Sequence, residues 1–266
     1  MEVFRHTDFD PAFTAHLELY LQLRSNGFTY ACTEPDNNRL MLLNNLDLSG
    51  EISDPDEKRM IGELSKEDLV FLPAARRTVI WSHLPFSLFP AEIGAGDIEK
   101  QASLLLDLSG QQICQDRYNE LVVAFALPVN IYSRYRDLFP GAVHRHLAGS
   151  LLSSNAEDHV IHMVIQEHLV LLSVRIDGKL HLANSYRFQT TDEFLYFLLL
   201  ATEQTGFDRE NGSVILSGQV AEDGKLFQET AKFFNHIRLE TSELWPDTAD
   251  HETLPQYFTP LLKMMS

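Results

Sequence analysis

The sequence predicts an α/β protein made of two tandem lobes, each with the order strand, strand, strand, helix, strand, helix, strand (β-β-β-α-β-α-β). Alternating apolar and polar residues, typical of half-buried strands, occur in groups of three short segments joined by tight turns. Helical and strand-like segments then alternate after each group. The same order occurs twice along the 266 residues, and the Pro140-Gly141 pair between the two series predicts lobes at residues 1–140 and 141–266.

The first group of strands begins with leucines at every second position from Leu17 to Leu23, which predicts a strand with one buried face. Asn26-Gly27 supplies the residues that a tight hairpin turn favours. A second turn, Pro35 to Asn38, precedes the last strand of the group. The three predicted strands cover residues 16–24, 28–33 and 39–46.

The rest of the first lobe alternates between helical and strand patterns. Asp54-Pro55-Asp56-Glu57 combines a capping residue, a proline at the first helical position and acidic residues in the first turn, as at a helix start. The apolar run Leu121 to Leu127 is typical of a parallel strand that is covered on both faces. The other predicted elements are a strand over 77–84, a helix over 97–108 and a connecting helix over 131–138.

Turn and capping signals are stronger in the second lobe. Asp177-Gly178 is the clearest hairpin signal in the chain, and Thr190 with Glu193 forms a capping box at a helix start. The short segment 142–148 is interpreted as a strand. The remaining predicted strands cover 160–166, 169–176, 179–185, 213–216 and 237–241, and the predicted helices cover 192–205 and 225–234.

The composition excludes several classes of protein. The formal net charge of −17, from 38 acidic and 21 basic residues, argues against a nucleic-acid partner or an anionic membrane surface, since phosphate contacts need clustered Lys and Arg. Two cysteines, Cys32 and Cys114, are too few for a disulfide framework. The longest apolar segment, residues 194–201, is far shorter than the roughly 20 residues that span a bilayer. We therefore expect a cytoplasmic protein without membrane insertion.

Four segments carry a narrower resemblance: Leu23 to Thr29 (LRSNGFT), Lys179 to Phe188 (KLHLANSYRF), Thr191 to Phe197 (TDEFLYF) and Leu216 to Gly218 (LSG). With these segments and the repeated order of elements, the chain resembles a family of uncharacterised bacterial proteins, a domain of unknown function with an actin-like ATPase fold. The resemblance implies two ribonuclease-H-like lobes. It brings no established activity.

The resemblance also indicates where nucleotide chemistry would lie. In the actin-like ATPase superfamily the first hairpin of each lobe is an Asp-x-Gly type turn, whose backbone N–H groups hold phosphates while its Asp organises magnesium. Lobe one has Ser25-Asn26-Gly27 at this place, with no carboxylate in the turn. Lobe two has Gln166-Glu167-His168, with no glycine and with a carboxylate that would repel phosphate unless a metal ion lay between them. A third feature of the superfamily, a turn of small residues that contacts the adenosine, is partly retained here as Ser217-Gly218.

These departures predict a binding or scaffold protein, a pseudo-ATPase with no catalytic residue and no required cofactor. Its partner would be an unidentified protein or small molecule. A first alternative is a divergent ATP-binding protein that holds ATP and Mg²⁺ between Ser25, Asn26 and Gly27 of one lobe and Ser217 and Gly218 of the other.

A second alternative is a metal-dependent enzyme. His144 and His146 have strand spacing, which projects two imidazoles from one face and supplies half of a metal site. Exposed strand positions are the competing interpretation. The other histidines of the group are His159, His162, His168 and His181.

The connecting helix carries an aromatic stripe at Tyr132, Tyr135 and Phe139. Its helical spacing predicts that the stripe belongs to the core between the lobes. Because Arg134 and Arg136 are interleaved with it, a partner-docking face is the alternative.

Overall fold

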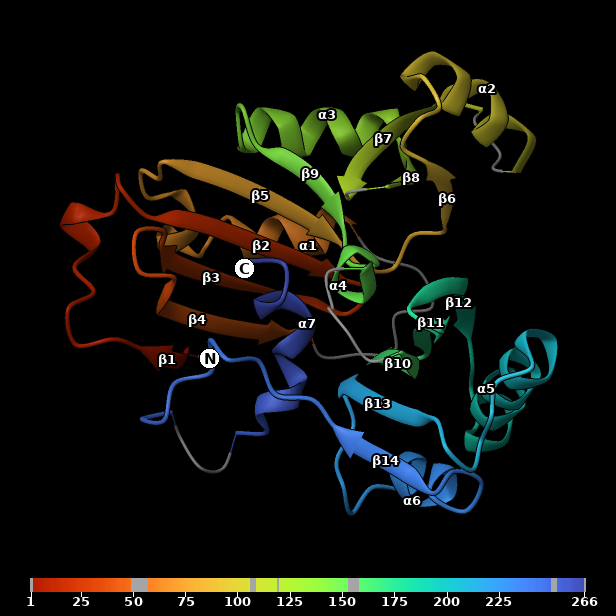
Figure 1. The fold of residues 1–266 in the computed structure, drawn as a ribbon. Coiled ribbons are helices and arrows are strands. Elements are labelled where there is room, and N and C mark those ends of the chain that lie inside the picture. The colour runs from red at the N-terminus through yellow and green to blue at the C-terminus, as the bar shows by residue number, and fades with distance from the viewer. Residues whose placement is uncertain are drawn as a thin grey trace. The chain divides into compact units, whose positions relative to one another are not determined.

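The computed structural model describes residues 2–48, 57–105, 109–118, 120–152, 158–249 and 253–265. The chain forms two compact units (Figure 1). Unit 1 contains Met1–Leu147, Pro246–Thr253 and Met265–Ser266, and unit 2 contains Ala148–Trp245 and Leu254–Met264.

The main sheet of unit 1 has six strands in the order β1-β4-β3-β2-β5-β9. The predicted meander is confirmed, because β2, β3 and β4 pair antiparallel in sequence. An additional strand, β1, pairs with β4, and β5 and β9 extend the sheet in parallel beyond β2. The strands are β1 (Glu2–Arg5), β2 (Glu18–Arg24), β3 (Gly27–Glu34), β4 (Arg39–Asp47), β5 (Arg76–Trp81) and β9 (Val143–His146).

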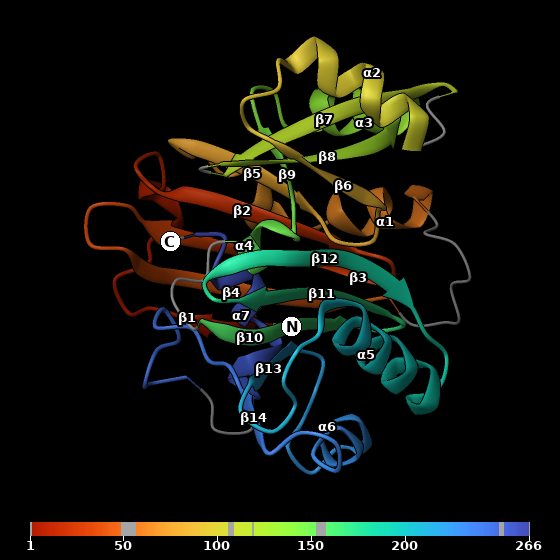
Figure 2. The same cartoon turned by 45° about the vertical axis from the view of Figure 1, so that its right-hand side comes forward.

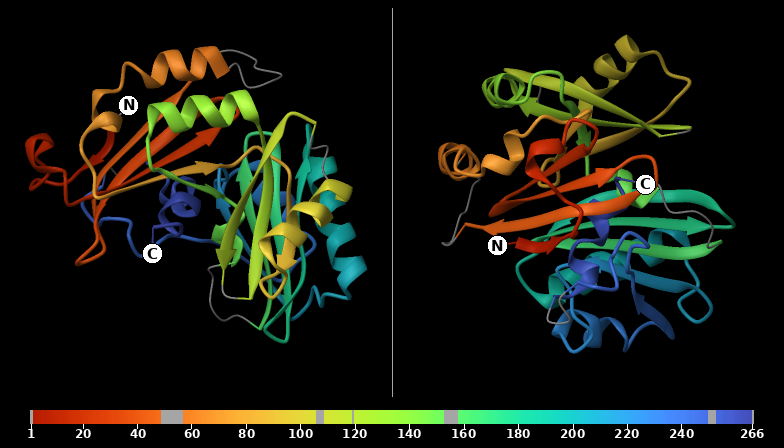
Figure 3. Two further views of the ribbon diagram at one scale, coloured as in Figure 1. Left: turned by 90° about the horizontal axis from the view of Figure 1, so that it is seen from above. Right: turned by 90° about the vertical axis from the view of Figure 1, so that its left-hand side faces the viewer.

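Two helices, α1 (Glu57–Leu64) and α3 (Val129–Leu138), lie on the same face of this sheet (Figure 3). Met60 and Leu64 of α1 and Tyr135 of α3 are buried against it. The predicted start signal for the first helix, residues 54–56, lies outside the described residues. Two short 3₁₀ helices, η1 (Pro11–Phe13) and η2 (Asp68–Phe71), complete the main part of unit 1.

A small antiparallel sheet, with the order β6-β8-β7, is inserted between β5 and α3. The prediction that residues 121–127 form a parallel strand of the main sheet is wrong, since β8 pairs antiparallel with both neighbours. Its apolar run has another cause: α2 lies on one side of the small sheet and α3 on the other (Figure 2), so both faces of β8 are covered. The inserted elements are β6 (Phe86–Pro90), α2 (Ala95–Leu105), β7 (Gln111–Tyr118) and β8 (Leu121–Pro128).

The predicted helix over 97–108 therefore packs on this small sheet rather than on the main one. Its buried residues Ile98 and Ala102 share a core with Phe89, Val122 and Ala124. Residues 106–108 of that prediction lie outside the described residues. The second helix and last strand of the β-β-β-α-β-α-β series in unit 1 are instead α3 and β9.

Strand β9 belongs to unit 1 although it follows residue 140. Its residues Val143 to His146 pair in parallel with Thr78 to Trp81 of β5. Arg145 of β9 also forms an ion pair with Asp116 of β7, with Nε and Oδ2 3.1 Å apart, and this pair links the small sheet to the main sheet. The interpretation of 142–148 as a strand is thus confirmed, and the strand completes the first series rather than opening the second.

Unit 2 follows the predicted order closely. Its sheet has the order β12-β11-β10-β13-β14. Strands β12, β11 and β10 pair antiparallel, β13 is parallel to β10, and β14 is parallel to β13. Asp177 and Gly178 form the predicted hairpin turn, with φ angles of 51° and 72°. The strands are β10 (His159–Gln166), β11 (Leu169–Ile176), β12 (Lys179–Arg187), β13 (Ser213–Gly218) and β14 (His236–Leu239).

Helices α5 (Thr191–Thr205) and α6 (Lys225–Thr230) enclose the main core of unit 2 against this sheet (Figure 2). The Thr190 hydroxyl caps α5 by accepting a hydrogen bond from the Glu193 N–H, as the capping box predicted. Short elements complete the unit: α4 (Gly149–Leu152), η3 (Pro255–Tyr257) and α7 (Thr259–Leu262). In the described part of the chain, no helix has the length and apolar character needed to cross a membrane.

Candidate functional site

The first hairpin of unit 1 joins β2 to β3 at the place predicted for a phosphate loop. Arg24 pairs with Gly27, so the central turn residues are Ser25 and Asn26 rather than Asn26 and Gly27. A Cβ atom on Gly27 would lie 2.1 Å from the backbone oxygen of Leu46. Contact with the neighbouring strand therefore requires glycine at this position, whether or not a ligand binds.

Arg24, the last residue of β2, extends its side chain to residues of β4. Its side chain is 6% exposed, and its Nη2 lies 2.5 Å from Oδ1 of Asp47. The same guanidinium donates to the side-chain oxygens of Asn26, at 3.2 Å, and Asn45, at 2.9 Å. The structure thus supplies a carboxylate that the turn itself lacks, and Arg24 neutralises it.

The first hairpin of unit 2 joins β10 to β11 through Gln166 and Leu169, which pair across the turn. Glu167 has a positive φ of 52°. Its backbone N–H donates to Oε1 of Gln219 at 2.7 Å. Gln219 in turn donates its own N–H to the Ile165 oxygen, also at 2.7 Å. A side chain of the same unit therefore occupies one of the N–H groups of this turn.

Ser217 and Gly218 end β13 directly beside this hairpin, because Ile165 of β10 pairs with Gly218. Gly218 has a φ of 85°, and a Cβ atom there would lie 2.1 Å from the Ile165 oxygen. The structure thus brings Ser217 and Gly218 together with the turn at 166–168 inside unit 2. The other predicted cleft residues, Ser25, Asn26 and Gly27, lie in unit 1.

Neither histidine of the predicted pair is exposed, since His146 is fully buried and His144 is half-buried. Nδ1 of His144 accepts a hydrogen bond from Nε1 of Trp81 at 3.1 Å, and Nε2 of His146 lies 3.1 Å from the Leu84 oxygen. Burial lowers the pKa of each imidazole to about 4. Over the described ranges of the chain, no group of three or more His, Cys, Asp or Glu side chains could hold a metal ion.

The aromatic stripe of α3 packs inside unit 1, so its interpretation as a core between the lobes is wrong. Tyr135 meets Trp81 edge to face, with ring centroids 5.0 Å apart. Phe139 stacks on Phe71 at 5.4 Å, and Tyr132 lies 5.0 Å from His144. The stripe faces the sheet of its own unit because α3 is the second helix of the first β-β-β-α-β-α-β series.

A small pocket of about 30 Å³ lies beside the hairpin of unit 1. Sequence reasoning missed it, since its lining comes from four separate segments and carries no local motif. The lining residues are Leu23, Arg24, Glu57, Met60, Trp81, His83, Ile131 and Tyr135. The pocket combines two charged side chains with three aromatic ones in a largely apolar wall.

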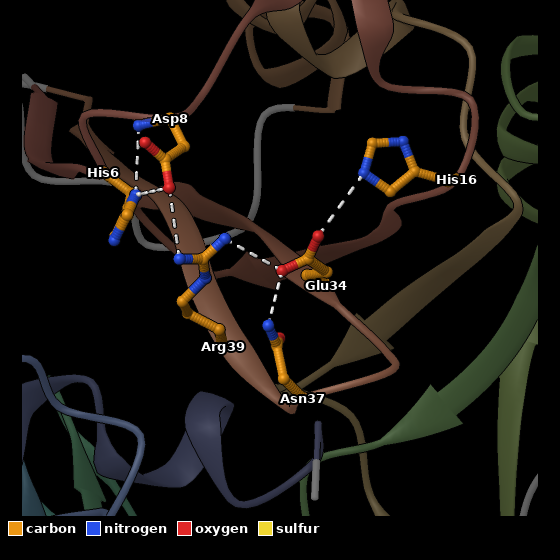
Figure 4. A network of polar contacts seen from close by, with 6 residues as sticks. All are labelled: His6, Asp8, His16, Glu34, Asn37 and Arg39. Carbon is orange, nitrogen blue, oxygen red and sulfur yellow. Dashed lines mark hydrogen bonds and ion pairs between the residues drawn. The ribbon is translucent and has the colours of Figure 1, made fainter.

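A polar network holds the turn between β3 and β4 (Figure 4). Arg39 bridges two carboxylates, with Nη2 3.0 Å from Glu34 and Nη1 3.2 Å from Asp8. Asn37 donates to the same oxygen of Glu34 at 2.7 Å. Each residue of this network has a partner within it, so the network stabilises the turn.

Known structures share this fold. A protein of Bacteroides thetaiotaomicron, described as having an actin-like ATPase fold and unknown function, superposes with a TM-score of 0.74 at 17% identity, over 87% of this chain and 93% of that one. The structure described as the PilM–PilN type IV pilus biogenesis complex gives a TM-score of 0.65 at 11% identity, over 93% of this chain and 97% of that one. At these identities the likeness shows the fold alone, and the fold is that of the actin-like ATPases.

The sequence itself matches one family model, described as protein of unknown function (DUF3822), over residues 6–237. No curated protein matches the chain.

Proposed function

We propose that this chain, which belongs to the DUF3822 family of proteins of unknown function, is a binding or scaffold protein of actin-like fold that does not hydrolyse ATP. Its partner is a protein or a small molecule. One observation carries the proposal: the Gln219 side chain occupies the Glu167 N–H in the turn where this fold would hold phosphate.

The chemistry of both hairpins supports this proposal. A phosphate needs exposed N–H donors, and Mg²⁺ needs oxygen ligands that are free to coordinate it. In unit 2 a phosphate would have to displace Gln219 and approach the Glu167 carboxylate. In unit 1 the Asp47 carboxylate beside the hairpin already has the Arg24 guanidinium at 2.5 Å, and a metal ion bound there would have to displace that cation.

The two glycines also have structural explanations. Gly27 and Gly218 are each required by a neighbouring backbone oxygen 2.1 Å from where a Cβ atom would be. They therefore do not favour the alternative of a divergent ATP-binding protein.

For the binding function, one structure of the same fold is described as a pilus biogenesis complex, PilM–PilN, which illustrates that this architecture can take part in protein association.

The same proposal places the protein in the bacterial cytoplasm. Both cysteines are free and buried, and burial raises the pKa of Cys32 and of Cys114 to about 12. Such thiols are inert, as expected of ordinary core residues in a reducing compartment.

Isothermal titration with ATP and Mg²⁺, together with a phosphate-release assay, tests the enzymatic half of the proposal. We expect no saturable heat and no phosphate above the buffer blank. Tight binding with phosphate release would overturn it.

Purification at native expression level tests the binding half of the proposal. A bound partner in stoichiometric amount is expected, and a chain that consistently elutes without a partner or ligand would count against a binding role.

A further inference from the structure

We infer that the small pocket of unit 1 binds an alkylammonium group, with Glu57 as its counter-ion. The group would be the tip of a lysine side chain or a small free amine, which share this chemistry. The inference goes beyond the proposed function, because it holds whether or not the protein binds or hydrolyses nucleotide.

The pocket lies where an α/β sheet usually binds ligands. Leu23 and Trp81 are neighbours in the parallel pair β2–β5, and both strands end at the pocket. The first residue of α1, Glu57, and the first half of α3, through Ile131 and Tyr135, form the other side. Ligands of open α/β sheets bind at the carboxyl ends of the strands, and this is such an end.

Glu57 supplies an acceptor that needs a donor. Its Oε1 is buried and has no hydrogen-bond partner among the described residues. Its Oε2 forms an ion pair with Nη1 of Arg134 at 3.8 Å, which is too long for a hydrogen bond, and solvent screens this pair because the Arg134 side chain is 47% exposed. Buried carboxylate oxygens are nearly always hydrogen-bonded, so this atom marks a place for a donating group.

The walls favour an organic cation over an anion or a large ligand. Trp81, His83 and Tyr135 present aromatic rings, which attract ammonium groups through their π faces. Leu23, Met60 and Ile131 provide apolar surface for methylene groups. The volume of about 30 Å³ suits the end of an alkyl chain rather than a whole amino acid.

Arg24 also lines the pocket, and its charge has to be accounted for. Asp47 neutralises it at 2.5 Å, and the side-chain oxygens of Asn26 and Asn45 and the backbone oxygen of Leu46 accept hydrogen bonds from it. Glu57 is then the acidic residue of the lining, and its ion-pair partner Arg134 does not line the pocket. The formal charge of −17 on the whole chain further favours cations near its surface.

Fluorine NMR tests the inference, because the chain contains only two tryptophans, Trp81 and Trp245. Protein labelled with 5-fluorotryptophan is titrated with ethylammonium chloride and with Nα-acetyl-lysine methylamide, against ethanol and sodium acetate at equal concentration and ionic strength. We expect a saturable shift of the Trp81 signal with the ammonium probes alone, and no shift of Trp245. Binding of both probes indicates a general amine site, and binding of the lysine derivative alone indicates a peptide side chain.

The Glu57→Gln variant removes the counter-ion and should weaken binding at least tenfold. Glu63→Gln on the same helix is the matched control, because Glu63 pairs with Lys66 and does not line the pocket. The inference fails if no ammonium probe shifts Trp81 saturably, if ethanol or acetate does so equally, or if Glu57→Gln binds as well as Glu63→Gln. Should Glu57→Gln not fold, the comparison of ammonium with ethanol on the unaltered protein still decides.

Discussion

The side-chain oxygen of Gln219 accepts a hydrogen bond from the backbone N–H of Glu167 at 2.7 Å. Because the Gln219 N–H donates to Ile165 at the same distance, the residue joins the end of β13 to the β10–β11 turn through two bonds. Glu167 itself has a φ of 52°, a backbone conformation that few residues with side chains favour. Under the proposed function, this internal amide takes up an N–H group that a phosphate would need as a donor.

Gln219→Ala removes the side-chain hydrogen bond to Glu167 and keeps the backbone bond to Ile165. We expect the free energy of unfolding to fall by about 1 kcal/mol, which is the usual net value of a hydrogen bond, and we expect no gain of ATP hydrolysis because the Glu167 carboxylate stays in place. Urea denaturation and phosphate release measure the two effects. Gln228→Ala, which removes an exposed side-chain bond to Asp223, is the control and should cost less. Hydrolysis in Gln219→Ala would contradict the account of this turn.

Gly218→Ala should be far more costly than the same change at another left-handed glycine. At Gly218 the new Cβ would lie 2.1 Å from the Ile165 oxygen, so backbone must move, and we expect a loss of about 2–4 kcal/mol. Gly206 ends α5 with a φ of 68° and open space around it, so Gly206→Ala should cost only about 1 kcal/mol. Chemical denaturation of both variants compares them, and equal losses would show that the close contact does not matter.

Local signals predicted most of unit 2. Asp177-Gly178 adopts the hairpin conformation that its residue types favour, and Thr190 caps α5 as its spacing from Glu193 predicted. These signals succeed because the residues that fix the conformation lie within four positions of one another. Thus the order of elements could be read directly in this unit, whereas some bounds differ, as in the helix predicted over 225–234 that ends at Thr230.

Unit 1 was harder to predict because tertiary context changed the meaning of two patterns. The apolar run in β8 reflects burial between α2 and α3, and periodicity cannot distinguish that from a parallel central strand. Strand β9 has only four residues, and its place in the sheet depends on pairing with β5, more than sixty positions earlier. Neither relationship leaves a local trace.

The candidate site shows the same limit. The sequence indicates a ligand-binding role for Gly27 and Gly218, yet a carbonyl oxygen of a neighbouring strand leaves no room for a side chain at either position. Gln219 and Glu167 are 52 positions apart, and nothing near either residue indicates their hydrogen bond. Arg24 is the last residue of a strand with alternating apolar and polar residues. Its side chain is buried nevertheless, because it forms an ion pair with Asp47 of β4.

The Trp81–His144 hydrogen bond should make stability depend on pH. The indole N–H can only donate, so Nδ1 of His144 must stay unprotonated, and burial lowers the pKa of this imidazole to about 4. The unfolded chain, with a histidine pKa of about 6.5, binds more protons between those values. This contribution is complete above pH 6.5 and is lost as the pH falls toward 4, by at most about 1.4 kcal/mol per pH unit.

Urea denaturation at pH 7.5, 6 and 5 measures this loss. His144→Asn keeps an acceptor near the Nδ1 position and does not titrate, so its stability should fall less steeply over the same range. His181→Asn, at an exposed position of β12, should follow the unaltered protein. Parallel pH profiles for His144→Asn and the unaltered chain would exclude this role for His144.

The last prediction concerns the carboxylate at the β3–β4 turn (Figure 4). The hydrogen bond from Asn37, followed by those from Arg39, holds the pKa of Glu34 below its usual value, against an opposing effect of desolvation. A lowered pKa contributes stability above the unfolded value of about 4.3, and this is lost as the pH falls through the folded pKa. Asn37→Ala removes the largest cause, so the pKa of Glu34 should rise, as carboxyl ¹³C NMR titration would measure. His16 lies 3.8 Å from the other oxygen of Glu34, so His16→Gln should raise the pKa less. A larger rise in His16→Gln than in Asn37→Ala would show that charge, rather than the hydrogen bond, governs this group.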